Sequence, residues 1–303
     1  MKFGKLADIS TVDFQLPADA PFNQQVYTGQ QAPQPVPFYI GCTGYSMKEW
    51  TGKVYPKGTK NKDYLHHYTR QFNTIEHNTT HYRIPEPDTI NKWRDEAPSD
   101  FRYCPKIPQR ISHSRDLGMG SQELRLFWER IGGLEDRLGC CFIQLPPHFA
   151  YKKLPLLREF LNMWPPSIPL AVEVRHETWF AEAQRTEDWL QVLRDSGKTA
   201  VITDVSGRRD VLHMGLSNLT TMIRFVGNGL HPSDYSRIDE WLNRLSQWID
   251  QGLREVYFFP HEPDNILAPE LASYLHSQAQ LLPNVVTRGP KLIEPDPEQL
   301  RLF

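Results

Sequence analysis

Short apolar runs alternate with amphipathic stretches along most of the chain. Between the apolar runs lie segments with apolar residues at helical spacing, such as TEDWLQVLRDSG and YSRIDEWLNRLSQWI. The link after the sixth run, GRRDVLHMGLSNL, has only a weak helical pattern. The apolar runs have the length of buried strands, and eight of them begin at Phe38, Thr74, Phe101, Cys140, Leu170, Thr199, Thr221 and Glu255.

Strands that alternate with helices predict parallel pairing through crossover connections. Eight such units in one chain predict an α/β protein of the closed (β/α)8 TIM-barrel type, which we expect to span residues 38–282. Residues 1–37 are rich in Pro, Gln and Ala without periodicity, and we expect an extended arm that lies on the body. Residues 283–303 are polar and proline-spaced, which predicts a flexible C-terminal tail.

Composition adds little to this picture. A net charge of −2 does not indicate nucleic-acid binding, so any basic surface has to be local. No apolar run approaches the roughly 20 residues of a membrane-spanning helix, and MKFGKLADIS has no signal-peptide pattern, so we expect a cytoplasmic protein. The four cysteines lie in apolar surroundings without zinc-ligand spacing, which predicts buried, reduced thiols.

Polar residues interrupt the apolar runs near their ends. Side chains alternate along a strand, so Glu76 and Asn78 share one face and Glu173 and Arg175 share another. The chemistry of a barrel lies at the carboxyl ends of its strands, and we expect these side chains to point into the mouth. Other runs supply further inward candidates near their ends, namely Lys106, Gln144, Asp204, Arg224 and His261.

Burying this many charges costs several kcal/mol for each unpaired group, so they must pair mutually or bind a ligand. Glu173 and Arg175 fit either a structural ion pair or a carboxylate poised beside a cation. His176 could face either way. Basic loops, including the one that carries Arg110, fall on the same predicted rim, which favours an anion-attracting mouth.

Several long motifs occur in one order: IGCTGYSMKEWTGKVYP, YTRQFNTIEHNTTHYRIPEPDTINKW, FRYCPKIPQRISHSRDL, FIQLPPHF, AVEVRHETWF and VITDV. They resemble the YecE-like family (domain of unknown function 72) from about Phe38 to about Arg224. The resemblance implies a (β/α)8 barrel, and its relation to metal-dependent endonucleases and sugar isomerases is an analogy of fold alone. The family's polar residues fall on Glu76, Asn78, Lys106, Gln144, Glu173, Arg175, His176, Asp204 and Arg224.

The last two strand ends depart from the family pattern. The family usually has Arg-Leu-His-Gly where this chain has Arg224-Phe225-Val226-Gly227. It usually has Asn-Asn-Asp where this chain has Pro260-His261-Glu262. Chemistry that depends on those groups is either absent or performed by His231 and His261.

The chain ends in a pentapeptide that resembles Gln-Leu-x-Leu-Phe, with which bacterial repair and replication proteins dock on the DNA sliding clamp. A tail can offer such apolar side chains to pockets on a partner while the glutamine forms oriented hydrogen bonds. The alternative is a tail that packs on the barrel. The residues concerned are Gln299, Leu300, Leu302 and Phe303.

Two kinds of function follow from these residues. An enzyme, such as a phosphodiester hydrolase in DNA repair, would use Glu173 or Glu76 as general acid or base and Asp204 to orient it. A non-catalytic adaptor would bind an anion or nucleic acid and reach the clamp through the tail. A sugar-phosphate isomerase-like enzyme is a third reading. A divalent metal bound by Glu173, Asp204 and His261 is not favoured, because the nearby arginine and lysine side chains compete for the carboxylates. The anion would bind to Lys106, Arg175, Arg224, Arg110, Asn78 and Gln144.

Overall fold

The computed structural model describes residues 3–30, 32 and 34–293. It is a mixed α/β structure in which every named strand pair is parallel, and each of the eight predicted runs contains a strand. Seven strands form one sheet in the order β4-β5-β6-β7-β8-β1-β9, and β2 pairs with β3. The strands are β1 (Val36–Ile40), β2 (Thr74–His77), β3 (Arg102–Pro105), β4 (Cys141–Gln144), β5 (Leu170–Glu173), β6 (Thr199–Asp204), β7 (Thr220–Val226), β8 (Glu255–His261) and β9 (Val285–Arg288).

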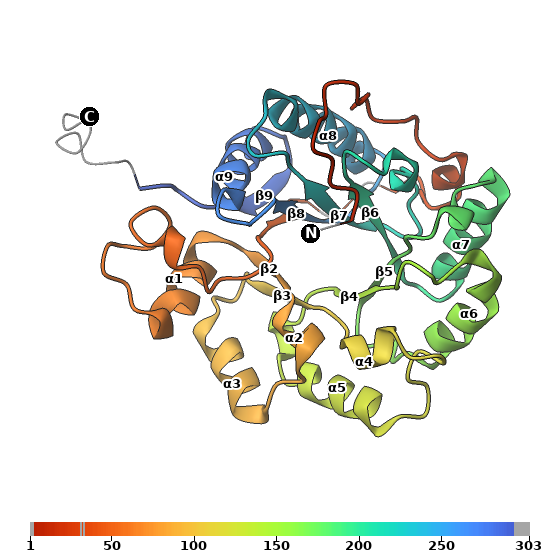
Figure 1. Ribbon diagram of the computed structural model, residues 1–303, viewed down its shortest axis with the longest axis horizontal. Helices are drawn as coiled ribbons and strands as arrows, with labels where there is room; N and C mark the ends of the chain where they lie inside the picture. Colours follow the sequence, from red (N-terminus) through yellow and green to blue (C-terminus); the bar gives the residue numbers. More distant parts are fainter. Residues whose placement is uncertain (1–2, 31, 33, 294–303) are drawn as a thin grey trace.

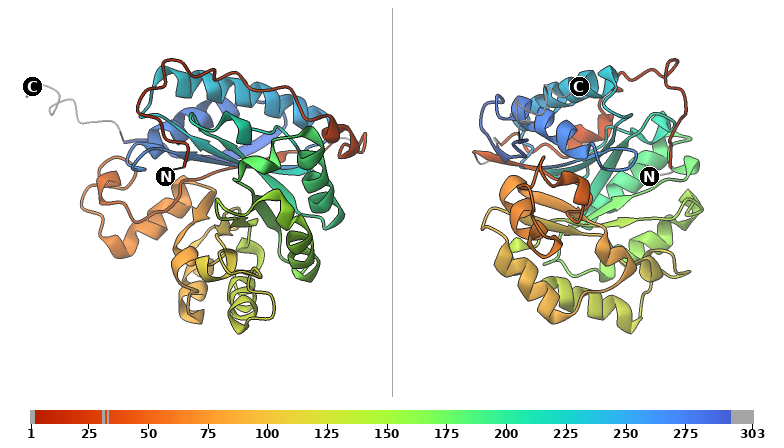
Figure 2. Two further views of the ribbon diagram at one scale, coloured as in Figure 1. Left: turned by 45° about the vertical axis from the view of Figure 1, so that its right-hand side comes forward. Right: turned by 60° about the vertical axis from the view of Figure 1, so that its left-hand side comes forward.

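Helices cover the outside of the strands, as Figures 1 and 2 show. The weak pattern after the sixth run corresponds to a short 3-10 helix, η7 (Arg209–Val211). The α-helices are α1 (Tyr64–Gln71), α2 (Thr79–Tyr82), α3 (Pro87–Glu96), α4 (Gln109–Ser112), α5 (Gln122–Gly132), α6 (Leu154–Met163), α7 (Ala183–Asp195), α8 (Pro232–Asp250) and α9 (Ala268–Ala279). The remaining 3-10 helices are η1 (Pro21–Gln25), η2 (Lys48–Trp50), η3 (Asn61–Asp63), η4 (Glu135–Arg137), η5 (Tyr151–Lys153) and η6 (Glu177–Trp179).

The two faces of the strands have separate apolar cores. Side chains on one face pack against the helices and belong to the larger cluster, which includes Val172 and Ile202. Side chains on the other face contact one another in a smaller cluster that draws on both sheets: Tyr39, Cys104, Cys140, Phe142, Ala171, Val201, Met222, Tyr257 and Phe259. Strands with both faces buried carry continuous apolar runs, as the sequence does.

Backbone hydrogen bonds link the two sheets. Glu76 N donates to Cys42 O at 3.0 Å beyond the end of β1, and Ile107 N donates to Phe142 O at 2.9 Å between β3 and β4. The carboxyl ends of strands from both sheets therefore lie close together. In the described part of the chain, no helix has the length and apolarity that crossing a membrane requires.

Segments near both ends of the described chain contact the body of the protein. Near the N-terminus, the side chain of Asn23 donates to Met214 O at 3.0 Å and accepts from Leu216 N at 2.7 Å. Near the C-terminus, strand β9 pairs with β1, although the sequence placed residues 285–288 in the tail. The run VVT is β-branched but too short to stand out among its polar neighbours.

Candidate functional site

Two buried carboxylates and one buried guanidinium form the centre of a polar network at the carboxyl ends of the strands. Arg224, on β7, donates from Nε and Nη2 to the two carboxylate oxygens of Glu76, both at 2.8 Å. Its Nη1 donates to Oε2 of Glu173 at 2.7 Å. Each of the three side chains is at most 2% exposed. Arg224 therefore joins carboxylates from both sheets in one ion-pair cluster.

Four donors surround the Glu173 carboxylate. Besides Arg224, Gln144 Nε2 donates to Oε2 at 2.7 Å and Arg175 Nε donates to Oε1 at 2.7 Å. Thr203 Oγ1 donates to Oε1 at 3.2 Å. The amide oxygen of Gln144 accepts from the Lys106 ammonium at 3.0 Å, so Gln144 bridges a cation and an anion.

The Glu76 carboxylate has two further neighbours. Asn78, the N-cap residue of α2, donates from Nδ2 to Oε1 at 2.9 Å. His261, at the end of β8, has its Nε2 2.9 Å from Oε2. Because an ionised carboxylate only accepts hydrogen bonds, this Nε2 carries the proton.

The electrostatics of the network favour ionised carboxylates. Burial on its own would raise the pKa of Glu76, but Arg224 and His261 hold it well below its usual value of 4.5. Burial likewise opposes ionisation of Glu173, yet Arg175 and Arg224 lower its pKa to about 2. The same carboxylates raise the pKa of Arg224 against the effect of burial. All three groups are charged at neutral pH.

Lys106 adds positive charge to the network. Burial lowers its pKa to about 8, with repulsion from Arg224 adding to the effect and Glu76 and Glu173 opposing it. Lys106 is therefore mostly protonated at pH 7. Burial lowers the pKa of His261, which favours its neutral form there. Together with Arg175 and Arg224, Lys106 gives three cations against two carboxylates, an excess of positive charge where water screens it poorly.

Asp204 lies elsewhere. Thr203 points toward Glu173, and the next residue points to the other face of β6. There the carboxylate accepts from Trp241 Nε1 at 2.8 Å and pairs with Arg237 at 2.8 Å and with Arg209. The expectation that Asp204 shares the mouth with Glu173 is wrong, because the register of β6 turns Thr203 inward.

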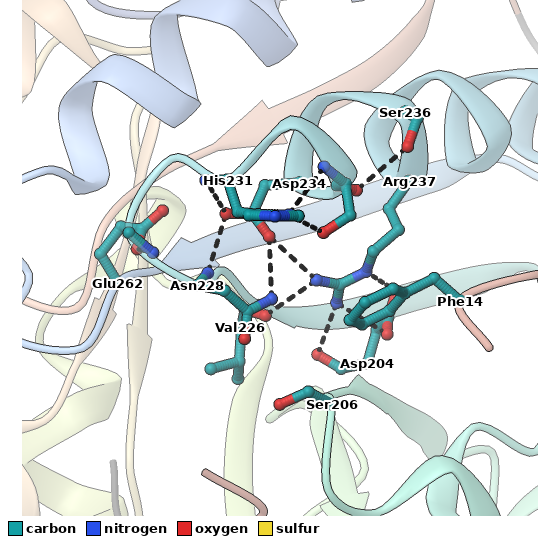
Figure 3. Close-up of polar contacts among 12 residues, drawn as sticks. Phe14, Asp204, Ser206, Val226, Asn228, His231, Asp234, Ser236, Arg237 and Glu262 are labelled. Atoms are coloured by element: carbon teal, nitrogen blue, oxygen red, sulfur yellow. Dashed lines mark hydrogen bonds and ion pairs between the residues drawn. The ribbon is translucent and has the colours of Figure 1, made fainter. Parts of the chain in front are cut away.

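A second polar cluster surrounds the start of α8 and includes Arg237 (Figure 3). Asp234 Oδ2 accepts from the backbone N–H groups of Asn228 at 2.8 Å and His231 at 3.0 Å, and Oδ1 pairs with Arg237 at 3.3 Å. His231, considered as a substitute for family groups, caps α8 by accepting from Ser233 N at 3.2 Å. The sequence HPSD contains this helix-capping pattern, which was not assigned to His231 from the sequence.

Two other predicted residues lie outside the Glu76–Glu173 network. Arg110, on α4, is exposed and lines an open outer groove of about 630 Å³ with Tyr82 and Leu126. His176 caps η6, where its Nδ1 accepts from Thr178 N at 3.2 Å. Both therefore remain candidates without a contact to the ion-pair cluster.

The described residues contain no assembled set of metal ligands. Across residues 3–30, 32 and 34–293, no group of three or more His, Cys, Asp or Glu side chains is arranged to hold a metal ion. Of the set named from the sequence, Glu173 binds arginines, His261 binds Glu76, and Asp204 lies on the other strand face. The predicted clamp-docking residues lie outside the described part: Gln299, Leu300, Leu302 and Phe303.

Sequence reasoning missed two residues that contact the network. Thr203 shares a strand face with Val201 of the inner cluster, but a threonine inside an apolar run does not stand out in the sequence. Phe3 places its ring centroid 4.4 Å from Cζ of Arg175, and the arm offers no periodicity that would single it out. The arrangement as a whole can hold an anion beside Lys106 and Arg175.

Fold and site together define the class: a parallel α/β protein with a buried ion-pair network at the carboxyl ends of its strands. The family model described as "Protein of unknown function DUF72" matches residues 39–296, and the chain belongs to this family. It is 31% identical over 255 residues to the UPF0759 protein YecE of Escherichia coli K12, covering 78% of this chain and 90% of that protein. The YecE protein of Escherichia coli O157:H7 matches equally.

A solved structure has the same fold. The crystal structure of a DUF72 family protein from Enterococcus faecalis V583 superimposes with a TM-score of 0.63. It covers 81% of this chain and 98% of that chain, and the two sequences are 18% identical. A likeness at this level of identity establishes the arrangement of the chain and leaves the chemistry to the residues themselves.

Proposed function

We propose that the chain closes into a (β/α)8 barrel whose mouth binds a small phosphate-bearing ligand, such as a nucleic-acid fragment. The observation that carries the proposal is the buried ammonium of Lys106, whose hydrogen-bond acceptor among the described residues is the neutral amide of Gln144. An ammonium has three hydrogens to donate, and phosphate oxygens are strong acceptors. Arg175, which is 8% exposed, lies on the same network and offers a second cation.

Binding is the first role that the electrostatics support. Glu76 and Glu173 are locked in ion pairs, and a carboxylate whose pKa is about 2, as for Glu173, is a weak base at neutral pH. This favours a ligand-binding protein over an enzyme that uses either carboxylate as general base.

A catalytic role is the second candidate, and Lys106 is the observation that favours it. Its pKa of about 8 lies in the range in which lysine exchanges protons near neutral pH. An enzyme built on this site would therefore use Lys106 for proton transfer, with Arg175 and Arg224 stabilising negative charge.

The test is phosphate binding measured by isothermal titration calorimetry with orthophosphate and ribose 5-phosphate. We expect Lys106→Met to weaken binding about 10- to 100-fold, because a hydrogen bond to a charged group contributes about 1.5–3 kcal/mol. Lys198→Met is the matched control, since Lys198 is also buried, at 4% exposed, and forms none of the described contacts of the network. Unchanged binding by the Lys106 variant, or none by the native protein, would refute the proposal.

A further inference from the structure

The N-terminal arm touches the network at its first described residue. The centroid of the Phe3 ring lies 4.4 Å from Cζ of Arg175 and 5.1 Å from Cζ of Arg208. In Figure 1 the red N-terminal segment passes in front of α8 and reaches the ends of β6 and β7. A residue from outside the family match, which begins at position 39, thus covers a cation of the candidate site.

The backbone beside Phe3 is fitted to the rim. Gly4 O accepts from Gly207 N at 2.8 Å and from Ser206 Oγ at 3.3 Å. Gly4 has φ +65, and a Cβ there would lie 2.9 Å from both methyl carbons of Val205. Close approach and a left-handed backbone therefore both require glycine at this point.

The two arginines that contact the Phe3 ring, Arg175 and Arg208, are held in place by other residues. Arg208 Nη2 donates to Arg175 O at 2.9 Å and to the Asp210 carboxylate at 2.6 Å, and Arg208 Nε donates to the same carboxylate at 2.7 Å. Arg175 is held through Nε by Glu173. Two oriented guanidinium groups thus face one flat ring, which is the arrangement that arginine offers to aromatic rings and nucleobases.

Between this tip and Phe14, whose backbone oxygen accepts from Arg209, most residues of the arm are exposed. Asp19 pairs with Arg244 at 2.5 Å and accepts from Trp248 Nε1 at 3.0 Å, which fixes the arm to α8. A cavity of about 210 Å³ lies between Lys5–Ile9 and the strand ends, and another of about 530 Å³ borders residues 11–17. The tip can therefore leave the rim while the anchor stays in place.

We propose that Phe3 occupies a stacking subsite, and that the natural ligand carries a flat aromatic ring that replaces Phe3 on Arg175 and Arg208. The inference rests on the proposed function. Arg175 contacts both the ion-pair network and the ring, so one molecule that carries a ring and a phosphate spans both. A nucleoside monophosphate has this composition, and base stacking on arginine is a general feature of nucleotide recognition. The arm is then a lid that the ligand displaces.

The test compares the full-length native protein with Phe3→Ala and Phe3→Leu, using uridine monophosphate and orthophosphate as calorimetric probes. Removing a competing occupant raises apparent affinity by the inverse of the open fraction. We expect Phe3→Ala to bind uridine monophosphate about 3- to 30-fold more tightly, the range that corresponds to a ring stacked on a partly buried guanidinium. Phe3→Leu, which keeps the bulk but lacks a π face, gives a smaller gain. Orthophosphate binding stays within about twofold in both variants.

A second readout reports the lid directly. Hydrogen exchange of the Gly207 amide, which Gly4 protects, accelerates when uridine monophosphate binds to the native protein and not when orthophosphate binds. Orthophosphate binding without a gain for uridine monophosphate in Phe3→Ala overturns the stacking subsite and leaves the phosphate site standing. Binding of neither probe to any of the three proteins overturns both.

Discussion

Arg224→Met tests whether the buried ion-pair network stabilises the fold. The change removes three hydrogen bonds, two to Glu76 and one to Glu173, and leaves both carboxylates buried beside an apolar side chain. Breaking a buried pair by removing one partner costs about 3–5 kcal/mol. We therefore expect the free energy of unfolding at pH 7 to fall by about that amount.

The pH dependence distinguishes this cause from a loss of packing. In the native protein the pKa of Glu173 is about 2, below the 4.5 of the unfolded chain, so its stabilising effect is complete above pH 4.5 and disappears as the pH falls toward 2. Without Arg224, burial raises the pKa of Glu76, so stability is lost as the pH rises instead, while Arg175 continues to lower the pKa of Glu173. The penalty should be larger at pH 8 than at pH 5, by about 1.4 kcal/mol for each unit that a pKa is raised within this range.

Urea denaturation at pH 5 and pH 8 measures both effects. Arg185→Met is the control, because Arg185 pairs with Glu182 on the surface and such pairs contribute little. A loss below about 1 kcal/mol, or an equal loss at both pH values, would mean that Arg224 does not stabilise the two carboxylates.

Three further predictions concern other parts of the chain. Burial lowers the pKa of His77 to about 3, so the free energy of unfolding falls as the pH drops below 6.5. His77→Phe should remove this loss, which amounts to about 2 kcal/mol at pH 5 and can be measured by urea titration. A variant with the same pH profile as the native protein would contradict this prediction. Burial raises the pKa of Glu262 to about 7, so the free energy of unfolding falls as the pH rises from 4.5 to 7. Glu262→Gln should therefore stabilise the protein by about 1–3 kcal/mol more at pH 8 than at pH 5. Equal shifts of the melting temperature at the two pH values would contradict this prediction. Deleting Leu302 and Phe303 should abolish capture by the DNA sliding clamp in a pull-down, whereas Arg301→Ala should not; capture of the truncated chain contradicts this.

The strands and their polar ends could be predicted because a buried parallel strand leaves a continuous apolar run. A glutamate or arginine near the end of such a run stands out, as Glu76, Glu173 and Arg224 do. Their pairing could not be derived. In a (β/α)8 barrel, alternate strands contribute side chains to separate layers, which would keep Gln144 and Glu173 apart. The two residues are instead register partners whose side chains are 2.7 Å apart. Long side chains reach between layers, which a rule about Cβ direction does not include.

The error at Asp204 has a related cause. Both faces of β6 are buried, and each face ends in a polar residue. The pattern of the sequence therefore does not indicate which of Thr203 and Asp204 points inward. The ion-pair partner of Asp204, Arg237, lies on α8 and is far from Asp204 in the sequence. Phe3 and strand β9 were missed because contacts over such distances leave no local pattern.

Strand β1 has a consequence for biosynthesis. The strands that pair with β1, namely β8 and β9, are among the last parts of the chain to be synthesised. While the ribosome is still translating, the apolar run Phe38–Ile40 has neither neighbour available, and non-local pairing of this kind is slow. Nascent chains that stop before residue 255 would therefore carry an open strand edge, which makes them substrates for chaperones and prone to aggregate.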